Sequence, residues 1–307
     1  MMWIAMKMIP RRGGMQIKRI VQGEYRMHQM QKQCFNNHCY SKRIYSTTNR
    51  ITYSALIKAY AKKGNVKKIE KIMFQEMKLS NIKPNVFHYT MLMNACLKRK
   101  KFKKVETYYE QMQSFNVEPT VHTYNTLIHA CGKNGGNVDE FVNEMNLDKN
   151  VKPDVVTYNT LIKIYGKKHG DYDKLLECFN EMKKNNIQPD IFTYNTLITL
   201  YAKKMNFSMV EKLVNDMQTH NTKPDIFTYN TLITLYAKEM NFSMVEKLLH
   251  EMNDLKPDVV IYNTLINLYE KDNDKVQKII TELESNEEII PNHVLKRTLN
   301  RVKKKDF

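Results

Sequence analysis

Apolar side chains recur along most of the chain with the spacing of amphipathic helices. Within residues 191–217, a first set falls at i, i+3, i+4 and i+7, which is one face of a helix: Tyr194, Leu197, Ile198 and Tyr201. After a short polar turn, a second set marks another helix: Phe207, Val210, Leu213, Val214 and Met217. A proline follows and cannot continue the second helix. The pattern therefore predicts a helical hairpin followed by a connector.

This hairpin pattern recurs in seven tandem units. A tyrosine near the start of each unit recurs every 33 to 36 residues: Tyr53, Tyr89, Tyr124, Tyr158, Tyr194, Tyr229 and Tyr262. A proline precedes each following unit: Pro84, Pro119, Pro153, Pro189, Pro224, Pro257 and Pro291. Residues 190–217 and 225–252 are nearly identical and differ at four of 28 positions. A period of this size is typical of a solenoid, whose repeats stack because one repeat cannot bury its own apolar face.

The predicted fold class is therefore all-α, with one array over residues 46–292. We number its units one to seven: 50–85, 86–120, 121–154, 155–190, 191–225, 226–258 and 259–292. In unit three the second helix, which begins at Val138, is about three residues short and follows the loose stretch GKNGGN. Residues 293–307 are expected to form a capping helix and a basic tail.

The units resemble pentatricopeptide repeats. The sequence reads VVTYNTLI at Val155, VHTYNTLI at Val121, VVIYNTLI at Val259 and IFTYNTLI twice, and Pro-Asp closes four units. The tryptophan-containing pattern of tetratricopeptide repeats is absent, since the one tryptophan is Trp3. The resemblance covers all seven units. It implies a right-handed superhelical α-solenoid that binds single-stranded RNA, with one base per repeat.

The polar face of each first helix carries a lysine in a constant register. With the tyrosine as position 4, position 13 is Lys62, Lys98, Lys133, Lys167, Lys203, Lys238 and Lys271. Seven ammonium groups in one row suit one RNA phosphate per repeat. The alternative is the favourable interaction of a cation with a helix C-terminus.

Position 5 and the last residue of each unit are also polar in a constant register. Position 5 is Ser54, Thr90, Asn125, Asn159, Asn195, Asn230 and Asn263. A carboxamide both donates and accepts, so it suits the edge of a base, and the alternative is a cap at the helix start. The last residue is Asn85, Thr120, Asp154, Asp190, Asp225, Asp258 and Asn292. Such a residue beside a helix start is expected to be an N-cap.

The resemblance implies that position 5 and the last residue together select a base. Ser with Asn in unit one implies adenine, and Thr with Thr in unit two is an uncommon pair that leaves the base open, with a purine favoured. Asn with Asp in units three to six implies uracil, and Asn with Asn in unit seven implies a pyrimidine. The implied site is close to 5′-A-purine-UUUU-Y-3′, which makes U-rich single-stranded RNA the expected partner.

Position 2 offers a further row of side chains: Ile51, Phe87, His122, Val156, Phe192, Phe227 and Val260. Such side chains can stack against successive bases. Packing between neighbouring repeats is the alternative.

Charge supports a polyanionic partner and is concentrated at the N-terminus. The net charge is +17, and residues 1–49 hold nine Lys or Arg against one acid, Glu24. Solubility alone is the other explanation for a basic chain. The basic, acid-poor start suits a mitochondrial transit peptide over residues 1–45, with RIYSTT at Arg43 implying cleavage after Tyr45. A basic arm that contacts RNA is the alternative.

Little in the sequence favours a cofactor, a metal or catalysis. Cys34 and Cys39 flank His38 as half of a zinc site, but no second half lies nearby, so no metal is expected. Cys96 and Cys131 fall at an apolar helix position and are expected to be buried. No deaminase signature occurs, and we expect no enzyme activity. The alternative function is a protein-binding scaffold, for example on the mitochondrial ribosome.

Overall fold

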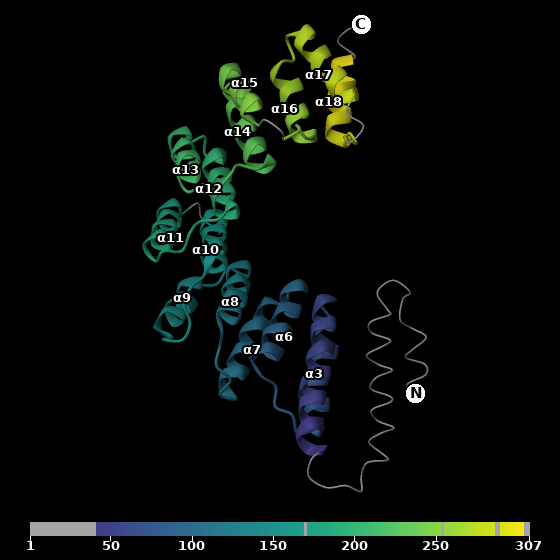
Figure 1. Ribbon diagram of the computed structural model, residues 1–307, viewed down its shortest axis with the longest axis vertical. Helices are drawn as coiled ribbons and strands as arrows, with labels where there is room; N and C mark the ends of the chain where they lie inside the picture. Colours follow the sequence, from purple (N-terminus) through teal and green to yellow (C-terminus); the bar gives the residue numbers. More distant parts are fainter. Residues whose placement is uncertain (1–40, 169–170, 253–254, 286–288, 304–307) are drawn as a thin grey trace, which may run out of the picture. The chain divides into compact units, whose positions relative to one another are not determined.

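The computed structural model describes residues 41–168, 171–252, 255–285 and 289–303, and the elements in these ranges are helices (Figure 1). The prediction of an all-α fold built from tandem hairpins is confirmed. The first 40 residues, which include Cys34, Cys39 and most of the expected transit peptide, lie outside the described residues. The chain divides into two compact parts, residues 1–152 and 153–307, which we call the N-terminal and C-terminal parts.

The N-terminal part contains units one to three. Unit one pairs α3 (Ser41–Lys62) with a second helix made of α4 (Val66–Lys71), the π-helical turn η1 (Ile72–Glu76) and α5 (Met77–Leu79). Unit two pairs α6 (Val86–Lys98) with α7 (Phe102–Ser114), and unit three pairs α8 (Val121–Asn134) with α9 (Val138–Leu147). The first helices contact one another in sequence, α3 with α6 and α6 with α8.

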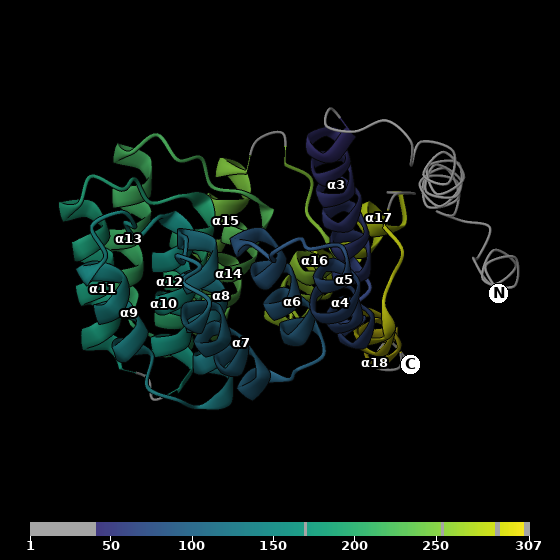
Figure 2. The same ribbon diagram turned by 90° about the horizontal axis from the view of Figure 1, so that it is seen from below.

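The C-terminal part contains units four to seven and a final helix. The hairpins are α10 (Val155–Lys168) with α11 (Tyr172–Lys184), α12 (Ile191–Lys203) with α13 (Phe207–Thr219), α14 (Ile226–Lys238) with α15 (Phe242–Glu251), and α16 (Val259–Leu268) with α17 (Asn273–Ser285). The first helices stack in order, and α18 (His293–Lys303) packs on α16. Both views show α11, α13 and α15 along one side of the row α10, α12, α14 (Figures 1 and 2).

In units five and six, the repeated tyrosine holds the two helices of the hairpin together. Tyr194 is completely buried, and its hydroxyl donates to Oδ2 of Asp216 near the end of the second helix over 2.8 Å. In the next unit the hydroxyl of Tyr229 donates to the carbonyl oxygen of Glu251 over 3.0 Å. The tyrosine therefore fills the core with its ring and fixes the far end of the hairpin with its hydroxyl.

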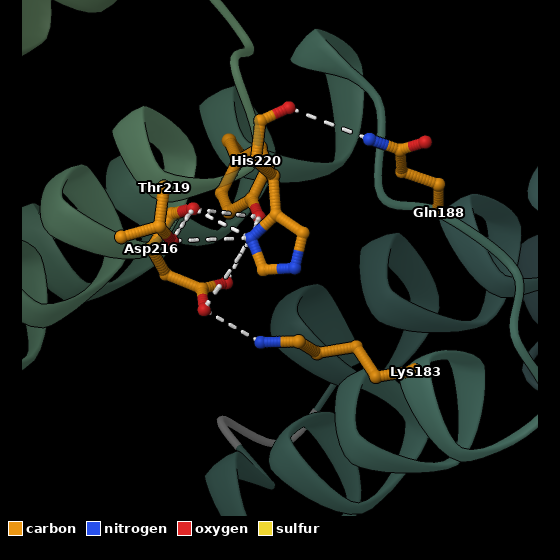
Figure 3. Close-up of polar contacts among 6 residues, drawn as sticks. Lys183, Gln188, Asp216, Thr219 and His220 are labelled. Atoms are coloured by element: carbon orange, nitrogen blue, oxygen red, sulfur yellow. Dashed lines mark hydrogen bonds and ion pairs between the residues drawn. The ribbon is translucent and has the colours of Figure 1, made fainter.

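Neighbouring hairpins are also joined through their second helices. Between units four and five, Nζ of Lys183 lies 2.6 Å from Oδ1 of Asp216, and the ring of His220 lies against the same turn (Figure 3). Burial alone would raise the pKa of Asp216, but the hydrogen bonds from Lys183 and Tyr194 hold that pKa below its ordinary value. The ionised carboxylate thus joins two second helices to one first helix.

The second helix of unit three is short, as the sequence predicts. Helix α9 has 10 residues, as does α15 of unit six, whereas α7, α11 and α13 each have 13. Helix α8 ends at Gly135, whose φ of +82° is a left-handed conformation that glycine adopts without strain. Within the described ranges, the helices lack the combination of length and apolar composition that a bilayer crossing requires.

Candidate nucleic-acid interface

In units four to six of the C-terminal part, the two side chains expected to select one base are in direct contact. The amide Nδ2 donates to the carboxylate in three pairs, over 3.1 Å in Asn159–Asp190, 3.0 Å in Asn195–Asp225 and 2.8 Å in Asn230–Asp258. The asparagine lies on the first helix of one unit, and the aspartate precedes the first helix of the next. The alternative that these asparagines cap their own helices is wrong, because their amides bond to the aspartate that caps the first helix of the following unit.

The aspartates are helix N-caps, as predicted. Oδ1 of Asp190 accepts from the backbone N–H of Thr193 over 2.8 Å, while the hydroxyl of Thr193 accepts from the backbone N–H of Asp190 over 3.2 Å. Asp225 and Thr228 form the same capping box. One carboxylate therefore both caps the first helix of the following unit and holds the asparagine of its own unit.

The threonine at position 3 is a member of this site that the sequence did not assign to it. The hydroxyl of Thr193 lies 2.6 Å from Oδ1 of Asn159, and the hydroxyl of Thr228 lies 2.6 Å from Oδ1 of Asn195. A threonine that recurs at position 3 is already explained by its part in the helix cap, so the sequence gives no sign of its contact with the asparagine. The amide is thus held at both of its ends.

The electrostatics of this site keep the carboxylate ionised. Burial would raise the pKa of Asp225, but the hydrogen bonds from the N–H of Thr228 and from the amide of Asn195 outweigh burial and lower that pKa. A carboxylate has about four acceptor sites, and an amide nitrogen has two hydrogens. The pair therefore retains acceptor and donor capacity for a ligand.

In the N-terminal part, unit one uses a different set of side chains. His88 takes position 3 of unit two, where its Nδ1 accepts from the N–H of Asn85 over 3.0 Å. Its Nε2 lies 2.9 Å from the hydroxyl of Ser54. Burial, and secondarily the charge of Arg50, lower the pKa of His88 to about 4. A neutral imidazole therefore joins Ser54 to Asn85.

The remaining pairs are less direct. In unit two, the hydroxyls of Thr90 and Thr120 lie 3.2 Å and 3.1 Å from the hydroxyl of Thr123, which stands between them. In unit seven, Oδ1 of Asn263 accepts from Thr298 of α18 over 2.8 Å, while Asn292 caps α18.

For unit three, the two expected side chains belong to different parts of the chain. Asn125 is buried in the N-terminal part. Asp154 lies in the C-terminal part, where Oδ1 accepts from the N–H of Thr157 over 2.8 Å.

The side chains at position 2 are mainly exposed. Between 47% and 71% of the surface is accessible for Ile51, Val156, Phe192, Phe227 and Val260. His122 is also exposed, and Phe87 is half-buried. Packing between repeats does not bury the five exposed side chains, which leaves them available for contact with a ligand.

The lysines at position 13 lie at or near the ends of the first helices. All seven are exposed: Lys62, Lys98, Lys133, Lys167, Lys203, Lys238 and Lys271. Nζ of Lys98 donates to the carbonyl oxygen of Lys62 over 3.0 Å, so the helix-terminus alternative is realised there. An ammonium group has three donors, so a lysine that bonds to a helix terminus keeps donors for a phosphate.

A groove of about 690 Å³ lies beside the caps of the N-terminal part. Asn85 and Thr120, the last residues of units one and two, line it together with Arg50 and Lys83. The groove therefore brings two expected base contacts next to positive charge.

The cysteine predictions are confirmed where the structure describes them. Cys96, Cys131 and Cys178 are buried and form no disulfide among the described residues. Burial raises the pKa of the Cys96 thiol to about 11, so this cysteine is a small apolar core residue at neutral pH. Among the described residues, no group of three or more His, Cys, Asp or Glu could hold a metal.

Comparisons with known families match most of the array. The PPR repeat family matches residues 48–98, 84–133, 153–203 and 189–238, which together exceed half of the chain. The PPR repeat matches residues 227–256, and the pentatricopeptide repeat domain matches residues 247–295. No curated protein matches the chain.

Among solved structures, the chain is similar to the pentatricopeptide repeat protein PPR10 in complex with an 18-nt psaJ RNA element. The TM-score is 0.71 at 24% identity, over 96% of this chain and 41% of that one. A structure of PPR10 from maize gives a TM-score of 0.58 at 22% identity, over 87% of this chain and 44% of that one. The chain thus spans less than half of either relative.

Proposed function

Because the chain belongs to the pentatricopeptide repeat family, we propose that it binds single-stranded RNA and selects one base with each pair of position 5 and last residue. The direct contact of Asn195 with Asp225 over 3.0 Å is the observation that carries this proposal. In units four to six, this contact brings together the two residue positions that the resemblance assigns to base selection. The related complex with an RNA element supports the same ligand class.

The chemistry of the pair suits uracil. Uracil presents an N3–H donor between two carbonyl acceptors. A carboxylate can accept from N3–H, while the second Nδ2 hydrogen of the asparagine can donate to a carbonyl oxygen. The exposed Phe192 and Phe227 at position 2 supply faces on which bases stack, worth about 1–3 kcal/mol per base. The lysines at position 13 supply phosphate contacts.

We extend the proposal to a site and a compartment. The site is close to 5′-A-purine-UUUU-Y-3′, and the basic N-terminus favours mitochondria. Binding there would shield a transcript end or open a hairpin that covers a start site. The proposal contains no catalytic step.

An equilibrium titration of the full chain tests base selection. The ligands are AGUUUUC and a shuffled version of the same bases, each inside a longer single strand, at two salt concentrations. A preference of about tenfold or more, or about 1.4 kcal/mol, that persists at the higher salt supports the proposal. Equal binding that falls steeply with salt would mean that only the lysines act. No binding to either strand would favour the protein-binding scaffold.

The duplicated units allow a sharper test of the pairs. Asn195→Thr together with Asn230→Thr should change the preferred base from U to G at two adjacent positions, by the family's pairing rule. Thr231→Val, on the same helix as Asn230 but outside the pairs, is the matched control. If U stays preferred at both positions, the assignment of pairs to bases is refuted.

A further inference from the structure

The hydroxyl at position 3 gives the asparagine amide a second hydrogen bond and so strengthens the orientation that the carboxylate sets. In Asn195, Nδ2 donates to Asp225, and Oδ1 lies 2.6 Å from the hydroxyl of Thr228. Thr228 is completely buried. Because the carboxylate can only accept, a flipped amide would lose the bond to Asp225 and set Oδ1 against that carboxylate. The hydroxyl of Thr228 would also have to turn its hydrogen from Oδ1 of Asn195 to Oδ1 of Asp225, which lies 2.9 Å away. Asn159 is held in the same way between Asp190 and Thr193.

Unit six carries the same pair without this donor. Asn230 donates to Oδ2 of Asp258 over 2.8 Å, but position 3 of the next unit is Ile261. Among the described residues, Oδ1 of Asn230 is buried and accepts no hydrogen bond. The isoleucine has no polar side-chain atom to offer. This amide is therefore held at one end only.

The threonine completes a capping box by accepting from the backbone N–H of the aspartate, but the aspartate caps its helix without the threonine. Asp258 accepts from the N–H groups of Val260 and Ile261 over 2.9 Å and 3.1 Å, so α16 is capped although position 3 is isoleucine. In unit seven, the side-chain carbonyl oxygen of the asparagine receives its hydrogen bond from a threonine at another position. Asn263 accepts from Thr298, which lies at a different register of α18. The contact to the asparagine is thus a separate role of the hydroxyl.

We propose that Thr193 and Thr228 are positioning residues for base selection, and that unit six discriminates between bases less sharply than unit five although both carry the Asn–Asp pair. The inference rests on the proposed RNA binding. A locked amide presents its second N–H to the ligand, which suits a base with a carbonyl acceptor. The amide of Asn230 breaks only its bond to Asp258 when it rotates to present its carbonyl oxygen, so unit six tolerates a base with a donor at that place more readily than unit five.

The experiment measures discrimination separately at two bases. The full chain is titrated with AGUUUUC in a longer strand and with versions in which the fifth or the sixth base is changed to C. In the native chain, we expect the ratio of the two dissociation constants to be about two- to tenfold larger for the fifth base than for the sixth. That range corresponds to the net contribution of one hydrogen bond, about 0.5–1.5 kcal/mol.

Substitutions should move the two ratios in opposite directions. Ile261→Thr should raise discrimination at the sixth base by about two- to tenfold and leave the fifth base unchanged. Thr228→Val should lower discrimination at the fifth base, whereas Thr228→Ser, which keeps the hydroxyl, should preserve it. Thr231→Val removes a hydroxyl that donates to the carbonyl oxygen of Phe227 and should change neither ratio. Melting curves of each variant separate loss of folding from loss of discrimination.

The outcomes distinguish a failure of the inference from a failure of the proposed RNA binding. If the chain binds neither strand, the proposed function fails and the inference falls with it. The inference alone is overturned under two conditions. The chain prefers U but discriminates equally well at the fifth and sixth bases, and neither Ile261→Thr nor Thr228→Val changes the ratio of dissociation constants at either base. Because Ile261→Thr is a predicted gain, the test does not depend on a variant that might fail to fold.

Discussion

The buried imidazole of His88 should make the stability of the N-terminal part depend on pH. Its Nδ1 already accepts a hydrogen bond from the N–H of Asn85, so a proton on Nδ1 would point at that N–H and break the bond. The hydroxyl of Ser54 donates to the carbonyl oxygen of Arg50 over 2.8 Å, which assigns the hydrogen between Ser54 and His88 to Nε2. The folded chain therefore holds His88 neutral, whereas the unfolded chain protonates it near its ordinary pKa.

The sign and size follow from the two pKa values. The pKa of His88 is about 4 in the folded chain, against 6.5 for the ordinary group. Between these values the unfolded state binds more protons, so the free energy of unfolding falls as pH falls, by up to about 1.4 kcal/mol per pH unit. Between pH 7 and pH 5, His88 should therefore cost at most about 2 kcal/mol. Above pH 6.5 the effect vanishes, and below pH 4 it becomes constant.

The assay compares melting of the native chain and of His88→Thr at pH 7 and pH 5. Threonine occupies position 3 in units three to six, so this variant should keep a capping box. On lowering the pH, the native midpoint should fall further than that of the variant, by roughly 4–8 °C at about 2–4 °C per kcal/mol. Replacement of the exposed His122 by threonine is the control and should follow the native chain. Equal falls in the native chain and His88→Thr would refute the assignment of a buried neutral imidazole.

Three further predictions concern packing, phosphate contacts and targeting. Gly166→Ala would place Cβ 2.2 Å from Cδ1 of Leu200 and should lower the free energy of unfolding by about 1–2 kcal/mol in chemical denaturation. Adding Leu200→Ala to that variant should cost less than Leu200→Ala alone, and equal costs would argue against the contact. Lys203→Gln and Lys238→Gln should each weaken matched and shuffled RNA alike and reduce the salt slope of binding by about one, so a base-selective loss would contradict a phosphate role. Residues 1–49 fused to a fluorescent protein should direct it to mitochondria, and a diffuse signal would favour the basic-arm alternative.

Local rules in the sequence determine the hairpins and their ends. The apolar spacing around Tyr194 and Tyr229 predicts helices that the structure contains, because a helix must place its apolar residues on one face. Asp190 and Asp225 are predictable as N-caps, since a carboxylate beside a helix start bonds to N–H groups only three residues away. The shortened second helix of unit three is likewise visible from the spacing alone. These features depend on contacts within one repeat.

Contacts between repeats depend on how the hairpins stack, which no local pattern specifies. The sequence places Asn195 and Thr228 33 residues apart, and only the packing of α12 against α14 brings their side chains to 2.6 Å. The depressed pKa of His88 has the same origin, because burial between two repeats removes water from its ring. Ile261 looks like a neutral variation in the sequence, yet it leaves the carbonyl oxygen of Asn230 buried without a donor. The sequence by itself therefore determines the repeat and its register, and the tertiary structure decides which side chains of neighbouring repeats form one site.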